Sequence, residues 1–181
     1  MLRRLRPLVP LAALCALAAF AVAPADAAHS THTAARSASA AVDIGVLEEM
    51  NQIRARHHLA PLTLSPNLSA AASLHSRDML ARGFFDHDSH NGQVFWKRIQ
   101  AFYPEGRFSY WSVGENLFWT TGSASAPASM KAWMASPEHR ANILNPVWRQ
   151  IGISSITSAD APGTFGNTDA TVITTDFGVR R

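Results

Sequence analysis

Cysteine is almost absent from this 181-residue chain, and the single one, Cys15, lies in an apolar stretch near the start. The rest of the chain has no thiol, which excludes disulfide bonds, thiolate catalysis and cysteine-based metal sites there. Glycine-rich phosphate loops and the G-x-S-x-G turn of α/β-hydrolases are also missing. The fold must therefore be held by core packing alone, and its function must be sought in other residues.

The first 27 residues have the pattern of a secretory signal peptide. Arg3, Arg4 and Arg6 precede an apolar run, and Ala25 and Ala27 fit an A-x-A cleavage site. The apolar run is near or below the ~18 residues that a membrane span usually needs, and no stop-transfer charges follow it. We therefore expect cleavage after residue 27 and a secreted protein, extracellular or periplasmic, with no transmembrane segment after cleavage.

Charge is scarce, and after cleavage it is balanced. Charged residues make up 16% of the chain and hydrophobic residues 47%, which is typical of a globular domain. Cleavage would remove three of the 16 basic residues and one of the 13 acidic residues, so the two signs nearly cancel. The alkaline isoelectric point of about 9.6 thus belongs largely to the signal peptide. This balance does not favour nucleic acid or an anionic membrane as a partner.

The domain boundaries follow from composition. Residues 28–42 are rich in serine, alanine and threonine without an apolar period, and we expect a disordered linker there. Residues 43–181 are long enough for one domain with a core of its own, and no internal repeat is present. We expect that domain to be a monomer.

Apolar spacing predicts helices in the first half of the domain and strands in the second. One helix begins near Asp43, with Ile44 and Met50 on its buried face, and ends at Pro61. A second begins at the N-cap Ser65 and ends at Gly83, with His75 facing the core. The remaining predictions are a short helix over 93–102, a strand over 111–119, helices over 124–136 and 136–145, and a β-hairpin that joins 150–157 to 170–178. This order predicts an α+β domain with helices packed on a small antiparallel sheet.

Three stretches contribute polar side chains that packing does not explain. His87 lies in the turn "DHDSH", Glu115 in the strand segment "GENL", and His139 in "SPEH" at the start of a helix. Ser136 suits the N-cap of that helix, and Glu138 suits its first turn. The positive end of a helix disfavours a protonated histidine, so His139 should stay neutral and able to act as a metal ligand. Taken singly, each residue is more often a surface or capping group.

Five stretches occur in an order that resembles the CAP superfamily, the cysteine-rich secretory, antigen 5 and pathogenesis-related 1 proteins, and in particular its bacterial SCP-like branch. They are "MNQIRARHHLAPL", "LHSRDMLARGFFDH", "GENLFW", "AWMASPEHRANIL" and "IGI". The resemblance implies a single-domain α-β-α sandwich with a central cleft lined by two histidines and two acidic residues, which in some members binds a divalent metal. His87, Glu115 and His139 match three of these positions. At the fourth, Ser136 stands where animal and plant members have glutamate, and Glu138 is the candidate substitute.

Three functions are consistent with this pattern. The first is a secreted binding module whose cleft takes a divalent metal or a small apolar ligand of the lipid or sterol class, and whose surface meets the cell envelope or another protein. Zinc would suit His87, His139 and Glu115 as ligands. The second is a hydrolase in which these residues use a metal-activated water. The third is a buried polar network that only fixes the core. Six aromatic residues could line a groove or belong to the core: Phe84, Phe85, Trp96, Phe118, Trp119 and Trp133.

Overall fold

A computed structural model describes residues 25–181 of the chain. The predicted signal peptide, residues 1–27, thus lies almost wholly outside the described residues. The elements are α1 (Ala25–Arg56), β1 (Thr63–Leu64), α2 (Pro66–Arg82), α3 (Phe95–Phe102), β2 (Trp111–Thr121), α4 (Ala126–Ala135), α5 (Pro137–Ile143), β3 (Gln150–Ala161), a 3-10 turn (Gly163–Phe165) and β4 (Thr168–Arg180).

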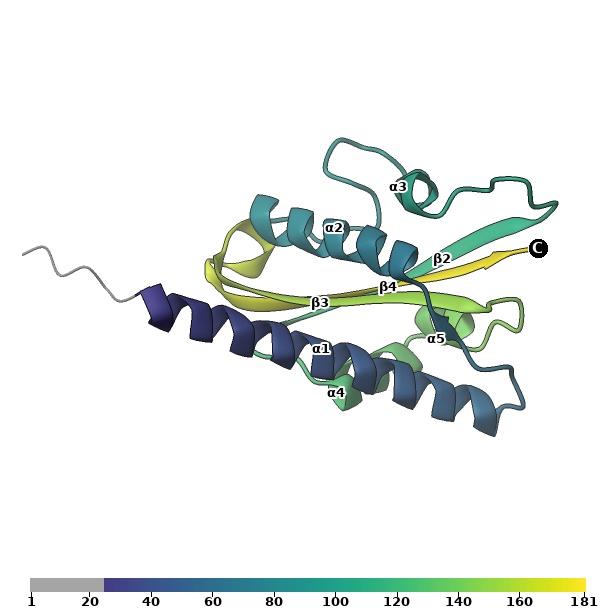
Figure 1. The fold of residues 1–181 in the computed structure, drawn as a ribbon, viewed down its shortest axis with the longest axis horizontal. Helices are drawn as coiled ribbons and strands as arrows, with labels where there is room; N and C mark the ends of the chain where they lie inside the picture. The colour runs from purple at the N-terminus through teal and green to yellow at the C-terminus, as the bar shows by residue number, and fades with distance from the viewer. Residues whose placement is uncertain (1–24) are drawn as a thin grey trace, which may run out of the picture.

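Helices cover both faces of one four-stranded sheet (Figure 1). The strand order is β1-β3-β4-β2, with α2 and α3 on one face and α1, α4 and α5 on the other. This arrangement confirms the predicted α-β-α sandwich. One detail differs, because the two-residue strand β1 pairs parallel to β3, whereas β2, β3 and β4 pair antiparallel. The sheet is therefore mixed at its edge rather than wholly antiparallel.

Strand β4 lies at the centre of the sheet and carries its most continuous buried sequence. It pairs with β2 on one side and β3 on the other, and every residue from Ala170 to Val179 is buried. The predicted hairpin of β3 and β4 is confirmed, with strands longer than expected and a shorter connection. A polar side chain on such a strand has no route to solvent, so it needs a partner inside the protein.

Helix α1 begins well before Asp43. Residues 28–42 are helical in the structure, where the sequence predicted a disordered linker. Alanine, the commonest residue of this stretch, is the strongest helix former. The helix is also tied to β3, because Asp43 Oδ1 accepts from the Ser155 N–H at 2.8 Å and the Ser155 hydroxyl donates to the Ser39 carbonyl at 3.0 Å.

The buried face of α1 includes Met50, as predicted, but not Ile44. Ile44 is 58% exposed, and the core contacts come from Val46, Met50 and Ile53. Arg54 is completely buried, and its guanidinium donates to the carbonyls of Ile143 and Asn145 at 2.7 and 3.0 Å. A buried arginine thus ties the end of α1 to the end of α5.

Helix α2 has the predicted ends and a close approach to the sheet. Ser65 caps its first turn by accepting from the Leu68 N–H, and Gly83 ends it in the left-handed conformation with φ of 72°. A Cβ atom at Gly152 of β3 would collide with the backbone of Leu68 and Ser69. Helix α2 can therefore lie directly against β3 only because this strand position is glycine.

The core fills the space on both faces of the sheet. Beneath α1, α4 and α5 it includes Trp133, Trp148, Ile151 and Phe177, and beneath α2 and α3 it includes Leu68, Met79, Ile99, Tyr103 and Phe165. Within residues 25–181, no helix combines the length and apolar character that a bilayer crossing requires.

Candidate functional site

The candidate site lies where β2 and β4 pair beneath α3. Glu115 of β2 stands directly opposite Asp176 of β4, and residues paired in this way point to the same face of a sheet. Glu115 is 4% exposed and Asp176 is completely buried. Two carboxyl groups in a dry interior must be neutralised by a cation or a proton, since an uncompensated buried charge costs several kcal/mol.

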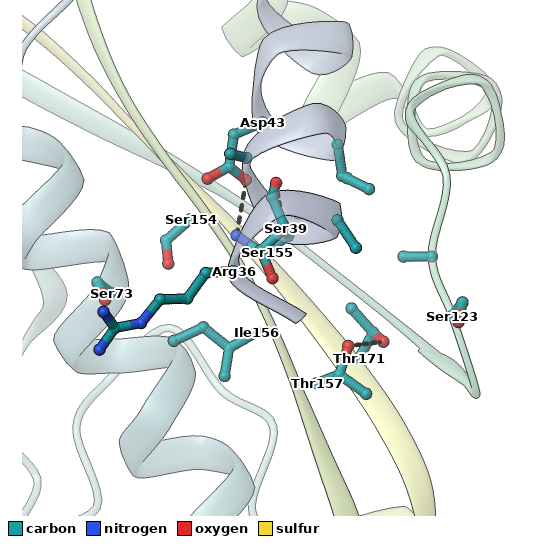
Figure 2. Close-up of a pocket in the computed structure, with 14 residues that line it drawn as sticks. Arg36, Ser39, Asp43, Ser73, Ser123, Ser154, Ser155, Ile156, Thr157 and Thr171 are labelled. Carbon is teal, nitrogen blue, oxygen red and sulfur yellow. Dashed lines mark hydrogen bonds between the residues drawn. The ribbon is translucent and has the colours of Figure 1, made fainter. Parts of the chain in front are cut away.

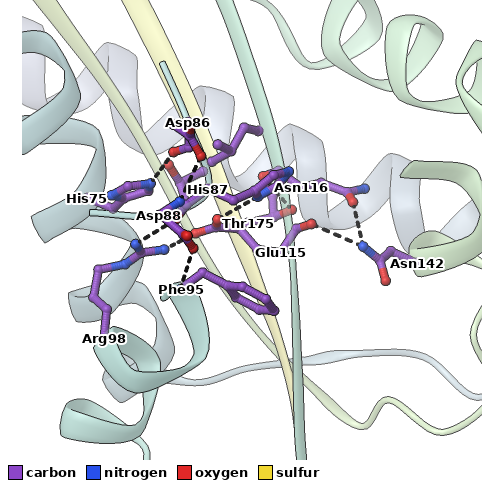
Figure 3. A network of polar contacts seen from close by, with 12 residues as sticks. His75, Asp86, His87, Asp88, Phe95, Arg98, Glu115, Asn116, Asn142 and Thr175 are labelled. Atoms are coloured by element: carbon purple, nitrogen blue, oxygen red, sulfur yellow. Dashed lines mark hydrogen bonds and ion pairs between the residues drawn. The ribbon is translucent and has the colours of Figure 1, made fainter. Parts of the chain in front are cut away.

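Arg98 of α3 supplies the cation (Figure 3). One terminal nitrogen pairs with Glu115 Oε2, and the other donates to the His87 carbonyl at 2.9 Å. The loop that carries His87 is folded back onto α3, because Asp88 Oδ1 accepts from the Phe95 N–H at 3.1 Å. Arg98 thus holds both the carboxylate and the loop that must meet it.

His87 completes this chain of contacts. Its Nδ1 lies 2.8 Å from Glu115 Oε1, and its Nε2 makes no hydrogen bond to any described residue. The side chain is 47% exposed. Burial lowers the pKa of His87, with the charge of Arg98 acting in the same direction. At neutral pH the ring is therefore neutral, with an Nδ1 proton donated to Glu115 and an Nε2 lone pair open to solvent.

The two carboxyl groups divide their roles. Burial raises the pKa of Glu115 to about 7, while Arg98 acts in the opposite direction. Burial and the charge of Glu115 raise the pKa of Asp176 well above its ordinary value. As a carboxylate, Asp176 would have no donor at either oxygen, whereas as an acid it can donate to Glu115. We therefore assign the proton to Asp176 and the negative charge to Glu115, which already has two donors.

Asparagine side chains tie α5 to strand β2 at Glu115 and Asn116. Asn142 Nδ2 donates to the Glu115 carbonyl and to Asn116 Oδ1, both at 3.0 Å, and Asn116 Nδ2 donates to the His139 carbonyl at 3.1 Å. Burial lowers the pKa of His139, and a protonated His87 would lower it further. The structure thus brings His87 and Glu115 into direct contact, whereas His139 is linked to this pair only through the hydrogen bond of its backbone carbonyl to Asn116.

Ser136 and Glu138 do not join this group. Ser136 occupies the N-cap position of α5, but its side chain makes no capping hydrogen bond, contrary to the sequence expectation. Glu138 is exposed, and it acts on His139 only as a nearby negative charge that opposes the lowering of its pKa. The pKa of His139 is lowered as predicted, and burial is the leading cause.

A sequence model of the "CAP: Cysteine-rich secretory protein family" matches residues 47–173, which is more than half of the chain. The chain belongs to this CAP family. The matched range includes β2, α5 and the loop before α3, and with them His87, Glu115 and His139. Asp176 lies three residues beyond it.

Relatives and solved structures agree with this membership. The uncharacterized protein YkwD of Bacillus subtilis is 35% identical over 125 residues, which are 69% of this CAP chain and 46% of YkwD. An extracellular protein containing an SCP domain from Bacillus anthracis has a TM-score of 0.60 at 24% identity, over 79% of this chain and 41% of that protein. An outer surface protein of Borrelia burgdorferi has a TM-score of 0.59 at 18% identity, over 75% and 90%. The matched part of this chain thus spans less than half of YkwD and of the Bacillus anthracis protein.

The aromatic residues of the CAP domain mostly serve its core. Trp133 is buried, and Phe84, Phe85, Phe118 and Trp119 are partly buried against core clusters. Trp96 is the exposed member of the six.

A cavity of about 620 Å³ lies elsewhere, between α1, α2 and the sheet (Figure 2). Its polar lining residues are Arg36, Ser39, Asp43, Ser73, Ser123, Ser154, Ser155, Thr157 and Thr171. Apolar residues, Val42 and Ile156 among them, complete the lining, so the cavity combines hydroxyl groups with apolar walls.

The sequence analysis did not predict two residues of the site, Arg98, which pairs with Glu115, and Asp176, which stands opposite it. Arg98 follows Trp96 and Lys97 on a short helix, where an arginine usually faces solvent. Asp176 gives a clearer signal, because it interrupts the apolar run of a strand buried on both faces. A carboxyl group at such a position needs a partner, and the antiparallel register supplies Glu115.

Proposed function

We propose that this CAP domain is an extracellular binding module, and that its cleft takes a divalent cation of the zinc class through His87 and His139. The single observation that carries the proposal is the contact of His87 Nδ1 with Glu115 Oε1 at 2.8 Å. A carboxylate on one imidazole nitrogen fixes the tautomer and makes the other nitrogen a better ligand. The predicted signal peptide and the extracellular and outer-surface descriptions of the structural neighbours support the location.

The donor set fits such an ion in part. Imidazole nitrogens suit zinc, but among the described residues no group of three or more His, Cys, Asp or Glu side chains could hold a metal. Both oxygens of Glu115 are engaged, one by His87 and one by Arg98. Our proposal therefore makes Glu115 the support of His87 rather than a third ligand. Two protein ligands imply moderate affinity, with water or a bound molecule completing the coordination.

The chain's own residues have defined tasks in this proposal. Arg98 favours the ionised form of Glu115 against the effect of burial. Glu115 accepts the Nδ1 proton of His87 in a hydrogen bond, and Asn116 and Asn142 fix the helix that carries His139. A bound cation would supply charge to polarise a water or ligand oxygen. A hydrolase in which these residues use a metal-activated water remains the alternative. A small apolar ligand is the other alternative, and the cavity between α1 and α2 has apolar lining residues for it, Val42 and Ile156 among them.

Zinc calorimetry on single variants tests the proposal. We expect His87→Ala and His139→Ala to abolish binding, and Glu115→Gln to weaken it about 10- to 100-fold, the range found for lost supporting contacts. His90→Ala is the matched control, because His90 is an exposed histidine of the loop that carries His87, and its removal should leave the affinity unchanged. Equal zinc binding by all four variants would contradict the assignment. Urea unfolding of the same proteins tests a purely structural role. That role predicts that the variants are less stable than the wild type and that the wild type binds no zinc.

A further inference from the structure

A second cavity, of about 280 Å³, lies between α2, α3 and the loop that joins them. Its walls include six side chains from these three segments: Leu74, His75, Ser89, Asn91, Gln93 and Arg98. Of these residues only Arg98 also belongs to the candidate site, where its two terminal nitrogens are engaged. The volume lies just below the range of about 300–1,000 Å³ that is usual for small-molecule sites, so a ligand of this cavity should be small.

Two of these side chains are buried and each has a nitrogen without a hydrogen-bond partner. His75 is completely buried and Arg98 is 3% exposed. Within the part of the chain that the structure describes, neither His75 Nδ1 nor Arg98 Nε has a partner. Buried polar groups without a partner are costly and rare in folded proteins. Because both side chains line the cavity, a molecule bound there can supply the two missing partners.

The protons on these two nitrogens define the chemistry of such a molecule. His75 Nε2 lies 2.8 Å from the Asp86 carbonyl (Figure 3). A carbonyl only accepts, so Nε2 carries the proton of the neutral ring and Nδ1 presents a lone pair. Arg98 Nε carries a hydrogen and can only donate. The ligand must therefore donate to His75 and accept from Arg98. A carboxylate or sulfate has no hydrogen to donate and an ammonium group has no lone pair, so neither satisfies both nitrogens.

Charge around the cavity also favours an uncharged ligand. Asp78 and Arg82 line the cavity and pair with each other, and Arg98 pairs with Glu115. The remaining polar walls, Ser89, Asn91 and Gln93, have side chains that both donate and accept hydrogen bonds. A neutral molecule with several groups of the same double character matches these walls.

We propose that this cavity binds the hydroxyl groups of a small neutral carbohydrate, of the size of one monosaccharide unit. A hydroxyl donates and accepts through one oxygen atom, so it is the smallest group that meets the demands of His75 and Arg98. Neighbouring hydroxyls of the same ring would meet Asn91 and Gln93. Leu74 is 48% exposed at the cavity wall and offers apolar surface to the C–H groups of the ring. The proposal does not depend on zinc binding, because the candidate site does not use Arg98 Nε.

NMR titration with the methyl glycosides of glucose, galactose and mannose tests this proposal. The nitrogen-15 resonance of His75 Nδ1 is the readout, because it responds when the lone pair accepts a hydrogen bond. We expect at least one glycoside to shift this resonance in a saturable way. Since the ligand is uncharged, its affinity should change by less than about two-fold between about 50 mM and 500 mM salt. No saturable shift with any of the three would overturn the proposal and leave the cavity to water. A shift with acetate or acetamide alone would also overturn it, in favour of an anion or an amide.

Substitutions at the cavity wall provide the second test. Gln93→Ala removes an exposed side chain and should weaken glycoside binding about five-fold, the usual effect of losing one neutral hydrogen bond. Gln52→Ala is the matched control, because Gln52 is an exposed glutamine of α1, and its removal should leave the affinity unchanged. Equal affinities in these two variants would contradict the assignment.

His75→Phe keeps a ring in place and removes Nδ1, so it should abolish binding in a protein that circular dichroism shows to be folded. Glycoside binding by folded His75→Phe would overturn the proposal, and if this variant does not fold, the Gln93 and Gln52 variants still decide. Zinc binding by Gln93→Ala should equal that of the wild type. This proposal and the proposed zinc binding can therefore fail separately.

Discussion

Acidification should destabilise the domain through His75, a completely buried ring beneath the loop that carries His87. Its Nε2 lies 2.8 Å from the Asp86 carbonyl, and since a carbonyl only accepts, Nε2 carries the proton. Burial, aided by the charge of Arg98, lowers the pKa of His75 from 6.5 to about 4. Between these two values the unfolded chain binds a proton that the folded protein rejects. The free energy of unfolding therefore falls as pH drops through this window, by about 3 kcal/mol in full.

Urea unfolding of the wild type and His75→Gln at intervals from pH 7 to pH 4 measures this effect. Glu115 acts in the opposite sense, because its raised pKa adds stability as pH falls through about 7. Subtracting the free energies of unfolding of the two proteins cancels the contribution of Glu115, which both share. We expect the variant to be less stable at pH 7, because its contact with Asp86 is disturbed, and to gain about 3 kcal/mol relative to the wild type by pH 4. A difference that stays constant with pH would refute the reasoning.

Five further substitutions test how the fold and the site are supported, each by urea unfolding. Ser65→Ala should cost about 1 kcal/mol because a capping hydrogen bond is lost, whereas Ser136→Ala should cost almost nothing because its side chain caps nothing; equal costs would contradict this. Gly152→Ala should destabilise strongly because its Cβ meets the backbone of α2, whereas Gly178→Ala should cost less because its Cβ meets only side chains. Arg98→Met should cost about 3–5 kcal/mol because it leaves a buried carboxylate without its cation; an unchanged midpoint would show that Glu115 is not ionised.

Local sequence signals predicted most of the fold. The ends of α2 follow from Ser65 and Gly83, whose side-chain chemistry and conformational freedom act within one turn of the helix. The start of α1 could not be predicted in the same way. Serine and threonine in residues 28–42 favour a linker, and only the contacts of Ser39 and Asp43 with β3 show that the helix is docked. Such contacts join residues more than a hundred positions apart.

The candidate site shows the same limit. His87, Glu115 and His139 were found because each belongs to a stretch that resembles the CAP family. The roles of Arg98 and Asp176 depend on tertiary packing. Arg98 of α3 pairs with Glu115 of β2, and Asp176 stands opposite Glu115 on the neighbouring strand β4. For this reason our proposal makes Glu115 the support of His87, whereas the sequence predicted a metal ligand. Its two oxygens are committed inside the protein, which no spacing of residues along the chain could reveal.

The central claim is that a neutral His87, held by Glu115 at Nδ1, offers its Nε2 to a ligand. Nitrogen-15 NMR of the histidine rings at neutral pH tests it most directly, because the two ring nitrogens have separate resonances and each reports its own proton. We predict a protonated Nδ1 and an unprotonated Nε2 for His87, and a shift of the Nε2 resonance on addition of zinc together with a change in His139. In Glu115→Gln this preference for the Nδ1 proton should weaken. A His87 ring that carries its proton on Nε2, or that does not respond to zinc, would contradict the account.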